Sequence, residues 1–363
     1  VRSMNKTIGV VTGGGDCPGL NAVIRAVVKA ASTHCWETLG IIGGYEGLLK
    51  PWKIRPLSSE MLEGLLVRGG TILGTANRGR FSAKVGHGDS RQLPAELLEE
   101  VKQSMQELGL FALISIGGDG SLSIAQQMHE YGIPIVGVPK TIDNDLQGTL
   151  MTFGFDSAVA CATDALDRLH STAESHNRVI VLEVMGRYAG WIALFAGVAG
   201  GADVILMPEI PFSYDSICKK IREREEQGKH FTLVIVAEGA REKDGEMITS
   251  AAQQKDREAR LGGIGALVTA ELEKRTGKEC RNCVLGHLQR GGTPTAFDRA
   301  LCSIFGAEAV ELIAQGELGK MVSYQGSRVG AVDLHEAVGS LKTVKRDGSL
   351  ATTARAIGIC LGD

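Results

Sequence analysis

One local order recurs along this chain: a short β-branched run, a glycine turn and then a helical pattern. Residues 7–11 form the first run, followed by Gly13-Gly14-Gly15 and by apolar residues at helical spacing over 21–31. The second copy begins with 112–116 and turns at Gly117. Strands that are apolar throughout and alternate with helices are typical of parallel sheets covered on both faces. The order therefore predicts an α/β fold.

Further buried runs extend this pattern and set the expected architecture. We expect two doubly wound domains with mainly parallel sheets, with a boundary near residue 155. Ligands of such sheets bind at the carboxyl ends of the strands, where the glycine turns lie. The additional strands are expected at 133–138, 179–184 and 233–237.

Composition limits the class of protein. A chain of 363 residues with 44% apolar and 22% charged residues can build two α/β domains. Its net charge of −3 gives no reason to expect a nucleic-acid partner. No apolar run approaches the roughly 20 residues that span a bilayer, and no signal sequence follows Val1. We expect a cytoplasmic protein without a membrane partner, in which Cys280 and Cys283 are strand thiols and not zinc ligands.

The two glycine turns have the composition of phosphate-binding loops. Glycines between a strand and a helix let backbone N–H groups approach a phosphate at the positive helix end. The first turn alone is weak evidence, because glycine also serves simple changes of direction. The second turn adds Asp119, whose carboxylate could hold Mg²⁺ beside substrate phosphates or could cap the following helix. The sequence leaves these two roles open.

A third segment, Pro139-Lys140-Thr141-Ile142-Asp143-Asn144-Asp145, directly follows a predicted strand. A carboxylate beside a metal-bound phosphate can take the proton of an attacking hydroxyl group. A turn-forming Asp-Asn-Asp is the alternative. The position after the strand favours catalysis.

Arginines next to glycines lie at the ends of later strands. Arg forms two parallel hydrogen bonds with a phosphate, which suits these positions to anion binding. Glu238, at the end of another strand, could bind sugar hydroxyls or form a structural ion pair. The arginines are Arg178, Arg187, Arg281 and Arg290.

Taken together, these motifs resemble the 6-phosphofructokinase family over residues 5 to about 325. The resemblance implies a glycolytic kinase that phosphorylates the 1-hydroxyl of fructose 6-phosphate with Asp143 as general base and Thr141 and Arg187 stabilising the transferring phosphoryl group. It implies Asp119 as the Mg²⁺ ligand. The nucleotide-phosphate loop would comprise Gly15, Gly118, Gly120 and Ser121, and the sugar-phosphate site Arg178, Met185, Gly186, Glu238, Arg281, His287 and Arg290.

Departures from the family's short bacterial members bear on the phosphoryl donor. The position of Lys140 is Gly in those members, and the position of Asn77 is an Arg near the donor, which Arg78 next door could replace. These features resemble the longer branch that contains both ATP- and pyrophosphate-dependent enzymes. Gly120 leaves room for the α-phosphate and nucleoside of ATP, whereas Lys140 would also suit pyrophosphate. A site that obstructs the α-phosphate cannot accept ATP, whereas an additional lysine does not prevent ATP from binding, so we expect ATP as the donor. A reversible pyrophosphate-dependent enzyme is the alternative.

The resemblance also implies domain roles and assembly. A donor-binding domain is expected over 1–154 and about 289–338, and a sugar-phosphate domain over 155–288 and about 339–363. Arg178 and Arg281 would reach across a subunit interface, which implies a homodimer or homotetramer. The resemblance also implies an allosteric enzyme. Two usually basic positions of the bacterial effector site are His170 and Gln227 here, which argues against regulation by ADP or phosphoenolpyruvate at that site, although Arg25 and Lys29 remain. A catalytically silent regulatory subunit is a further alternative, against which the intact Asp119, Asp143 and Arg187 argue.

Overall fold

The computed structural model describes residues 6–76, 79–81, 92–249 and 261–363. These form two compact units, each assembled from segments that are distant in the sequence. Unit 1 comprises 1–141, 145–156 and 290–341, and unit 2 comprises 142–144, 157–289 and 342–363. Within the third sequence motif, the chain therefore passes from unit 1 to unit 2 and back.

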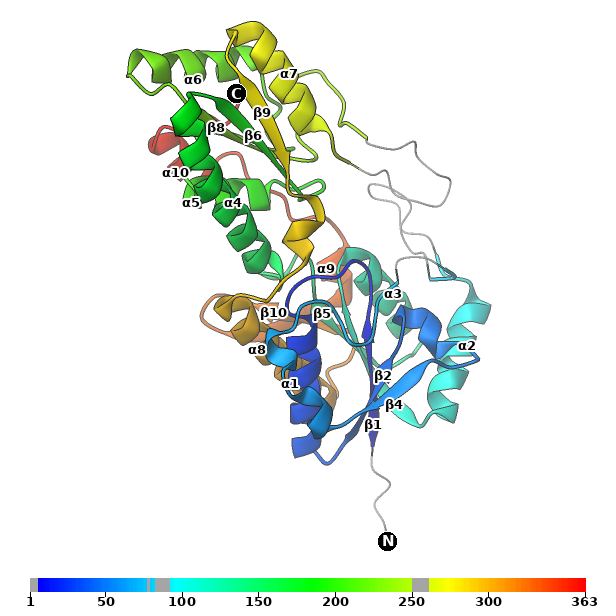
Figure 1. Cartoon of the computed structure of the whole chain (residues 1–363). Coiled ribbons are helices and arrows are strands. Elements are labelled where there is room, and N and C mark those ends of the chain that lie inside the picture. The colour runs from blue at the N-terminus through cyan, green and yellow to red at the C-terminus, as the bar shows by residue number, and fades with distance from the viewer. Residues whose placement is uncertain (1–5, 77–78, 82–91, 250–260) are drawn as a thin grey trace. The chain divides into compact units, whose positions relative to one another are not determined.

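A seven-stranded sheet forms the centre of unit 1, in the order β11-β10-β5-β4-β1-β2-β3 (Figure 1). The five inner strands are parallel, and the edge strands β3 and β11 are antiparallel to their neighbours. All carboxyl ends of the parallel strands thus lie at one edge, where the glycine turns follow β1 and β4. The strands are β1 (Thr7–Thr12), β2 (Glu37–Ile41), β3 (Ile54–Leu57), β4 (Leu110–Gly117), β5 (Ile135–Pro139), β10 (Lys320–Tyr324) and β11 (Val329–Asp333).

Helices cover both faces of this sheet. Helices α1 (Leu20–Thr33) and α8 (Ala296–Gln315) pack against each other on one face, and α2 and α3 lie on the other in Figure 1. Apolar side chains of α2, α3 and α9 join those of the strands in one buried core. The remaining helices of unit 1 are α2 (Ala95–Glu107), α3 (Asp119–Glu130), α9 (Leu334–Val338) and the 3-10 turns η1 (Gly44–Leu48), η2 (Ser59–Leu62) and η3 (Leu65–Val67).

Unit 2 is built on a smaller, fully parallel sheet of four strands in the order β7-β8-β6-β9. Strands β6 (Val179–Val184) and β8 (Thr232–Ala237) are buried along their whole length, as their mostly apolar sequences predict, and the one carboxylate in β6, Glu183, is buried as well. The outer strands are β7 (Val204–Leu206) and β9 (Cys280–Val284). Cys280 and Cys283 lie on β9, as predicted, and neither forms a disulfide.

The helices of unit 2 also lie on both faces of its sheet. Helices α6 (Tyr214–Glu226) and α7 (Ile264–Thr276) share a core with β6, β7 and β8, and α5 (Trp191–Ala199) packs against β7 and β8. The C-terminal segment returns to the sheet, where Cys360 forms a parallel bridge with Val204. The other helices are α4 (Phe155–His176), whose first two residues belong to unit 1, α10 (Ser349–Ala356) and the 3-10 turn η4 (Gly286–Arg290).

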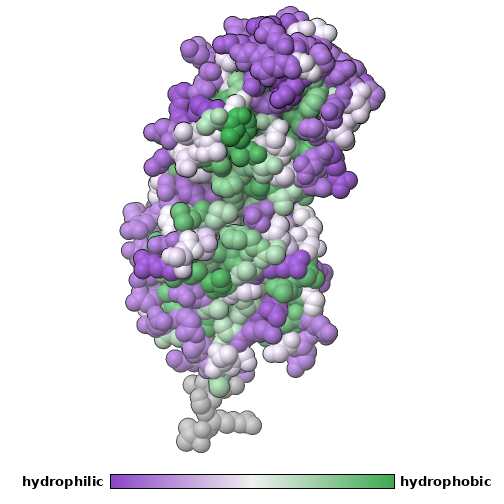
Figure 2. All heavy atoms as spheres, turned by 90° about the vertical axis from the view of Figure 1, so that its left-hand side faces the viewer, coloured by the Kyte–Doolittle hydropathy of each residue, from purple (hydrophilic) through white to green (hydrophobic). Residues whose placement is uncertain are grey.

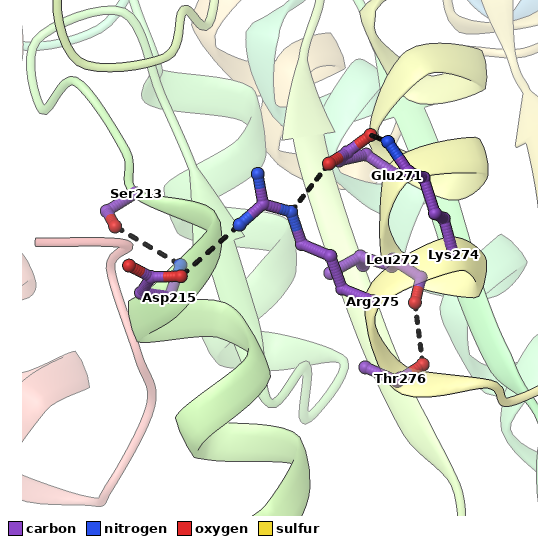
Figure 3. Close-up of polar contacts among 7 residues, drawn as sticks. All are labelled: Ser213, Asp215, Glu271, Leu272, Lys274, Arg275 and Thr276. Carbon is purple, nitrogen blue, oxygen red and sulfur yellow. Dashed lines mark hydrogen bonds and ion pairs between the residues drawn. The ribbon is translucent and has the colours of Figure 1, made fainter.

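A polar cluster joins α6 to α7 on the surface of unit 2 (Figure 3). Arg275 Nε lies 2.6 Å from Glu271 Oε1 on its own helix, and Arg275 Nη1 lies 3.3 Å from Asp215 Oδ1 at the start of α6. The same guanidinium stacks over the Tyr214 ring at 5.0 Å. Ser213 caps α6 by accepting a hydrogen bond from the Asp215 N–H. Arg275 thus makes structural contacts with both helices.

Large apolar side chains also reach the surface. Figure 2 shows hydrophobic residues between polar ones on one face. Among the described residues, Leu288 is 68% exposed, Ile357 61% and Leu150 58%. Within the described ranges, no helix is long and apolar enough to cross a membrane.

The expected α/β class with mainly parallel sheets is confirmed. The first and last residues of each predicted strand differ by at most two positions from those of an observed strand. The sequence analysis did not predict the antiparallel edge strands β3 and β11, which are short and less buried than the inner strands.

Candidate active site

Three turns of unit 1 meet at the carboxyl ends of β1, β4 and β5. The first turn, Gly13-Gly14-Gly15, lies next to the end of β4, where the Gly13 N–H donates a hydrogen bond to the Ile116 carbonyl. A Cβ atom on Gly13 would lie 2.5 Å from Ser121 Oγ. Glycine is therefore required at Gly13 by the approach of Ser121, and at Gly14 by a φ of 75°. The backbone of this turn lies against the start of α3.

The second turn places Asp119 and Gly120 in the first turn of α3. The N-cap residue is Gly118, so Asp119 is not the side-chain cap that one reading of the sequence allowed. The helix N-terminus adds the positive end of the backbone dipole at this place, which favours an anion. A Cβ atom on Gly120 would meet no atom within 4 Å, so open space surrounds this residue.

Lys140 connects the third turn to the first. Its side chain is buried, with 4% exposure, and its Nζ donates a 2.5 Å hydrogen bond to the Gly15 carbonyl. Its own N–H bonds the Gly117 carbonyl. Thr141 follows, and its carbonyl accepts from Thr152 Oγ1 at 2.7 Å. A buried ammonium thus lies at the glycine turn, where donor phosphates are expected.

The residues of this region suit a Mg²⁺ ion whose coordination is completed by substrate phosphates. Mg²⁺ is commonly held by one or two carboxylates together with phosphates and water. Asp119 offers such a carboxylate at the helix terminus. The described residues contain no group of three or more His, Cys, Asp and Glu side chains that could hold a metal ion by themselves. Asp119 could therefore hold Mg²⁺ only together with donor phosphates and water.

Arg290 also lies at the first turn. Its Nη1 donates to the Asp16 carbonyl at 3.2 Å, and a Cβ atom on Gly15 would approach that same nitrogen to 2.6 Å. The sequence grouped Arg290 with the sugar-phosphate residues. The structure places it in unit 1, beside Gly15, whereas the other predicted sugar-phosphate residues belong to unit 2.

Unit 2 brings Arg187 and Glu238 together. Arg187 N–H donates to Glu238 Oε1 at 3.1 Å, in the loop that follows β6. Arg187 has φ 50° and Gly186 has φ 141°, so the loop makes a tight turn that exposes the Arg187 side chain. The loop closes against Gly239, where a Cβ atom would lie 2.0 Å from the Arg187 carbonyl oxygen. The loop, which we call the Arg187 loop, comprises residues 185–190 and begins with the half-buried Met185.

The other two arginines share one carboxylate. Arg178 Nε lies 2.8 Å from Glu279 Oε2, and Arg281 Nη2 pairs with Glu279 Oε1. The hydrogen bond from Arg178 is the main reason that the pKa of Glu279 is lowered from its ordinary value. Arg178 is half-buried and Arg281 is exposed, and both lie at the amino ends of β6 and β9, whereas Arg187 and Glu238 follow the carboxyl ends of β6 and β8. His287 is an exposed residue of η4 in the same unit.

Asp143 and Asn144 belong to unit 2, unlike Thr141. The Asp143 side chain has only 4% exposure, and Asn144 adopts a left-handed backbone with φ 51°. Lys342 Nζ donates to Asn144 Oδ1 at 2.9 Å. The predicted base therefore lies on a constrained turn. Of the remaining predicted residues, Asn77 and Arg78 lie outside the described residues.

With this geometry established, comparisons with known proteins identify the family. The family model described as phosphofructokinase matches residues 7–313. The chain is 53% identical to the protein named ATP-dependent 6-phosphofructokinase of Chloroflexus aurantiacus, over 100% of this chain and 99% of that one. The chain belongs to the phosphofructokinase family.

Other phosphofructokinase relatives differ in donor. A protein of Amycolatopsis methanolica named pyrophosphate–fructose 6-phosphate 1-phosphotransferase is 48% identical over 93% of this chain and 96% of its own length. Among solved structures, Pichia pastoris phosphofructokinase in the T-state is similar with TM-score 0.80 and 31% identity, over 98% of this chain and 37% of that longer chain. The pyrophosphate-dependent phosphofructokinase of Marinobacter aquaeolei, at 22% identity and TM-score 0.79, shares the fold. The mixed-donor branch inferred from the sequence is thus confirmed.

Two residues of this phosphofructokinase site were missed by the sequence analysis. Glu279 lies two positions before Arg281, and alternation along a strand offered a signal for that pair. Lys342 lies 198 positions from Asn144, and no local pattern connects them.

Proposed function

We propose that this chain transfers the terminal phosphoryl group of Mg-ATP to the 1-hydroxyl of fructose 6-phosphate, which makes it an ATP-dependent 6-phosphofructokinase. The observation that carries the proposal is the 53% identity, over essentially both full lengths, to a relative with that name. The donor-side turns and the cationic acceptor residues agree with this chemistry.

The open space at Gly120 supports ATP as the donor. No neighbour forces glycine there, since a Cβ atom would meet nothing within 4 Å and the backbone lies outside the left-handed region. A glycine that the fold itself does not require is consistent with room kept for a ligand. A carboxylate at this position would repel and obstruct an α-phosphate.

The predicted catalytic residues have complementary tasks. Asp143 takes the proton of the 1-hydroxyl as that oxygen attacks the phosphorus. Thr141 and Arg187 stabilise the negative charge on the transferring group, since phosphoryl transfer depends chiefly on positioning and electrostatics. Asp119 and the donor phosphates would hold Mg²⁺, which would supply positive charge beside the transferring group.

The residues predicted to hold the acceptor belong to unit 2, except for Arg290, which belongs to unit 1. His287 and Arg290 would contact the 6-phosphate from the same chain, and Arg178 and Arg281 of a neighbouring subunit would supply further guanidinium groups. Glu238, which already orients the Arg187 loop through its N–H, binds a sugar hydroxyl with its carboxylate. Met185 and Gly186 shape the floor of this site.

The pyrophosphate-dependent reaction is the second candidate, and Lys140 is the observation that favours it. Its buried ammonium at the glycine turn would attract either donor. The relative from Amycolatopsis methanolica has a pyrophosphate-dependent name at 48% identity. We rank it second because Lys140 does not exclude ATP, whereas an obstructed α-phosphate site would.

We further propose a cytoplasmic homo-oligomer. Arg178 and Arg281 would then serve an active site across a subunit interface. Exposed apolar residues of the kind found at interfaces include Val284 and Leu288 in unit 2 and Phe297 in unit 1. Sedimentation of the purified protein tests this, and a monomer at micromolar concentration would contradict it.

The activity itself is tested by identifying the product. Purified protein is incubated with fructose 6-phosphate, ATP and Mg²⁺, and the sugar is analysed by ³¹P NMR. We expect fructose 1,6-bisphosphate. Failure to phosphorylate the sugar with any donor would refute the proposed function and favour a regulatory subunit.

A further inference from the structure

Lys342 connects the predicted base to the C-terminal segment of the chain. Its Nζ donates to Asn144 Oδ1 at 2.9 Å, and Asn144 directly follows Asp143. Asn144 is 2% exposed and has a left-handed backbone with φ 51°. Such a conformation costs a non-glycine residue free energy, which the surrounding contacts must offset. A charged donor on the Asn144 side chain provides such a contact.

The same lysine also contacts the helix that follows the Arg187 loop. Trp191 Nε1 donates to the Lys342 carbonyl at 2.8 Å, and Lys342 Nζ lies 5.8 Å from the centre of the Trp191 ring. Trp191 is the first residue of α5 and follows Gly190, the last residue of that loop. Lys342 therefore joins the turn of the base to the end of the loop that carries Arg187.

Glu209 makes a second connection between the C-terminal segment and this loop, at Val344, two residues after Lys342. Its Oε1 accepts from Val344 N–H at 2.8 Å and from Gly190 N–H at 3.0 Å. The carboxylate is largely enclosed, and burial raises its pKa above the ordinary value. The C-terminal segment is thus bound twice to the Arg187 loop, once through Trp191 and once through Glu209.

We propose that Lys342 is a positioning residue for phosphoryl transfer, which holds the Asp143-Asn144 turn and the Arg187 loop in their catalytic arrangement within unit 2. This inference rests on the proposed function for its catalytic consequence. Lys342 would act on the transfer through Asn144 and Trp191, without contact with the attacking oxygen or the phosphorus atom. The arrangement lies within unit 2, because that unit contains all five residues: Asp143, Asn144, Arg187, Trp191 and Lys342.

Substitution of Lys342 by Met removes the ammonium and keeps a long side chain. We expect Lys342→Met to lower kcat about 10- to 100-fold, because misplacement of catalytic groups by about 1 Å can cost 100-fold, and to leave KM for both substrates nearly unchanged. Lys342→Arg should recover most of the rate, since a guanidinium can still donate to Asn144. Lys345→Met, on an exposed lysine of the same segment, is the matched control and should behave as wild type.

A double-mutant cycle separates this role from general stability. Asn144→Gly removes the acceptor and tolerates the left-handed backbone. If Lys342 acts through Asn144, the double variant loses no more activity than the more affected single variant. Fully multiplicative losses would contradict the connection. Rates are expressed per folded enzyme, so that a merely structural role would lower the melting temperature without lowering kcat.

Amide hydrogen exchange over residues 142–145 supplies a readout that does not need activity. Lys342→Met should exchange faster there than Lys345→Met. An unchanged exchange rate, or a kcat within two-fold of wild type, would overturn the inference while leaving the proposed function standing. If the wild type phosphorylates no sugar, the proposed function fails, and the exchange rate alone then decides whether Lys342 holds the turn.

Discussion

Replacement of Gly239 by alanine should damage catalysis through the Arg187 loop. A Cβ atom at this position would lie 2.0 Å from the Arg187 carbonyl oxygen, whereas real Cβ contacts essentially never fall below 3.0 Å. The two segments must therefore separate by about 1 Å. The partner atom is backbone, so no side-chain rotation relieves the contact. Gly239 has an ordinary backbone conformation, so the alanine itself adds no backbone strain.

The expected effect follows from that displacement. Overpacking of this kind costs about 1–3 kcal/mol of stability. A 1 Å shift of a group that stabilises the transferring phosphoryl lowers kcat by about 100-fold. Steady-state kinetics with fructose 6-phosphate and ATP, expressed per folded enzyme, measures the loss. A kcat within two-fold of wild type would show that the Arg187 loop does not need its observed position.

Gly330→Ala is the matched control for this substitution. Gly330 lies on β11 in unit 1, and a Cβ atom there would meet nothing within 4 Å. Its backbone also lies outside the left-handed region, so alanine is free to stabilise the fold by about 0.4–1 kcal/mol. We expect unchanged kcat and an equal or higher melting temperature.

Three further substitutions test the separate roles. Asp143→Ser should lower kcat by orders of magnitude and leave fructose 6-phosphate binding largely intact, and near-normal turnover would contradict its role as base. Arg281→Ala should raise KM for fructose 6-phosphate by at least about 10-fold, because a charged phosphate contact is lost. Arg275→Ala removes the contacts with Glu271 and Asp215 that Figure 3 draws and the contact with the Tyr214 ring, and it should leave KM unchanged. Gly120→Asp should preserve folding, because open space surrounds the position, and should raise KM for ATP about 10-fold or more; an unaltered ATP KM would refute the steric argument.

Local sequence patterns predicted the parts of this protein that depend on short stretches of chain. The mostly apolar sequence of β6 predicted a buried parallel strand, and the glycines at 13–15 predicted the turn after β1. The same local reasoning located Asp119 at a helix N-terminus. It left its role open, and the structure removed one option by placing Gly118 at the N-cap.

Contacts between distant segments could not be predicted in this way. The bond between Lys342 and Asn144 joins residues 198 positions apart, and the approach of Arg290 to Asp16 spans 274. Such pairs are decided by how the units assemble and not by periodicity. For the same reason the sequence could not show that Asp143 belongs to a different unit from Thr141, although only Ile142 separates them.

The most direct test of the central claim is a paired assay of the purified wild-type protein. Fructose 6-phosphate and Mg²⁺ are held constant, and kcat/KM is measured with ATP and with pyrophosphate. We predict that ATP is the preferred donor by at least about 100-fold, which corresponds to a discrimination of about 2.7 kcal/mol between the two transition states. Turnover with pyrophosphate alone would contradict the donor assignment and show that Lys140, not Gly120, decides the donor.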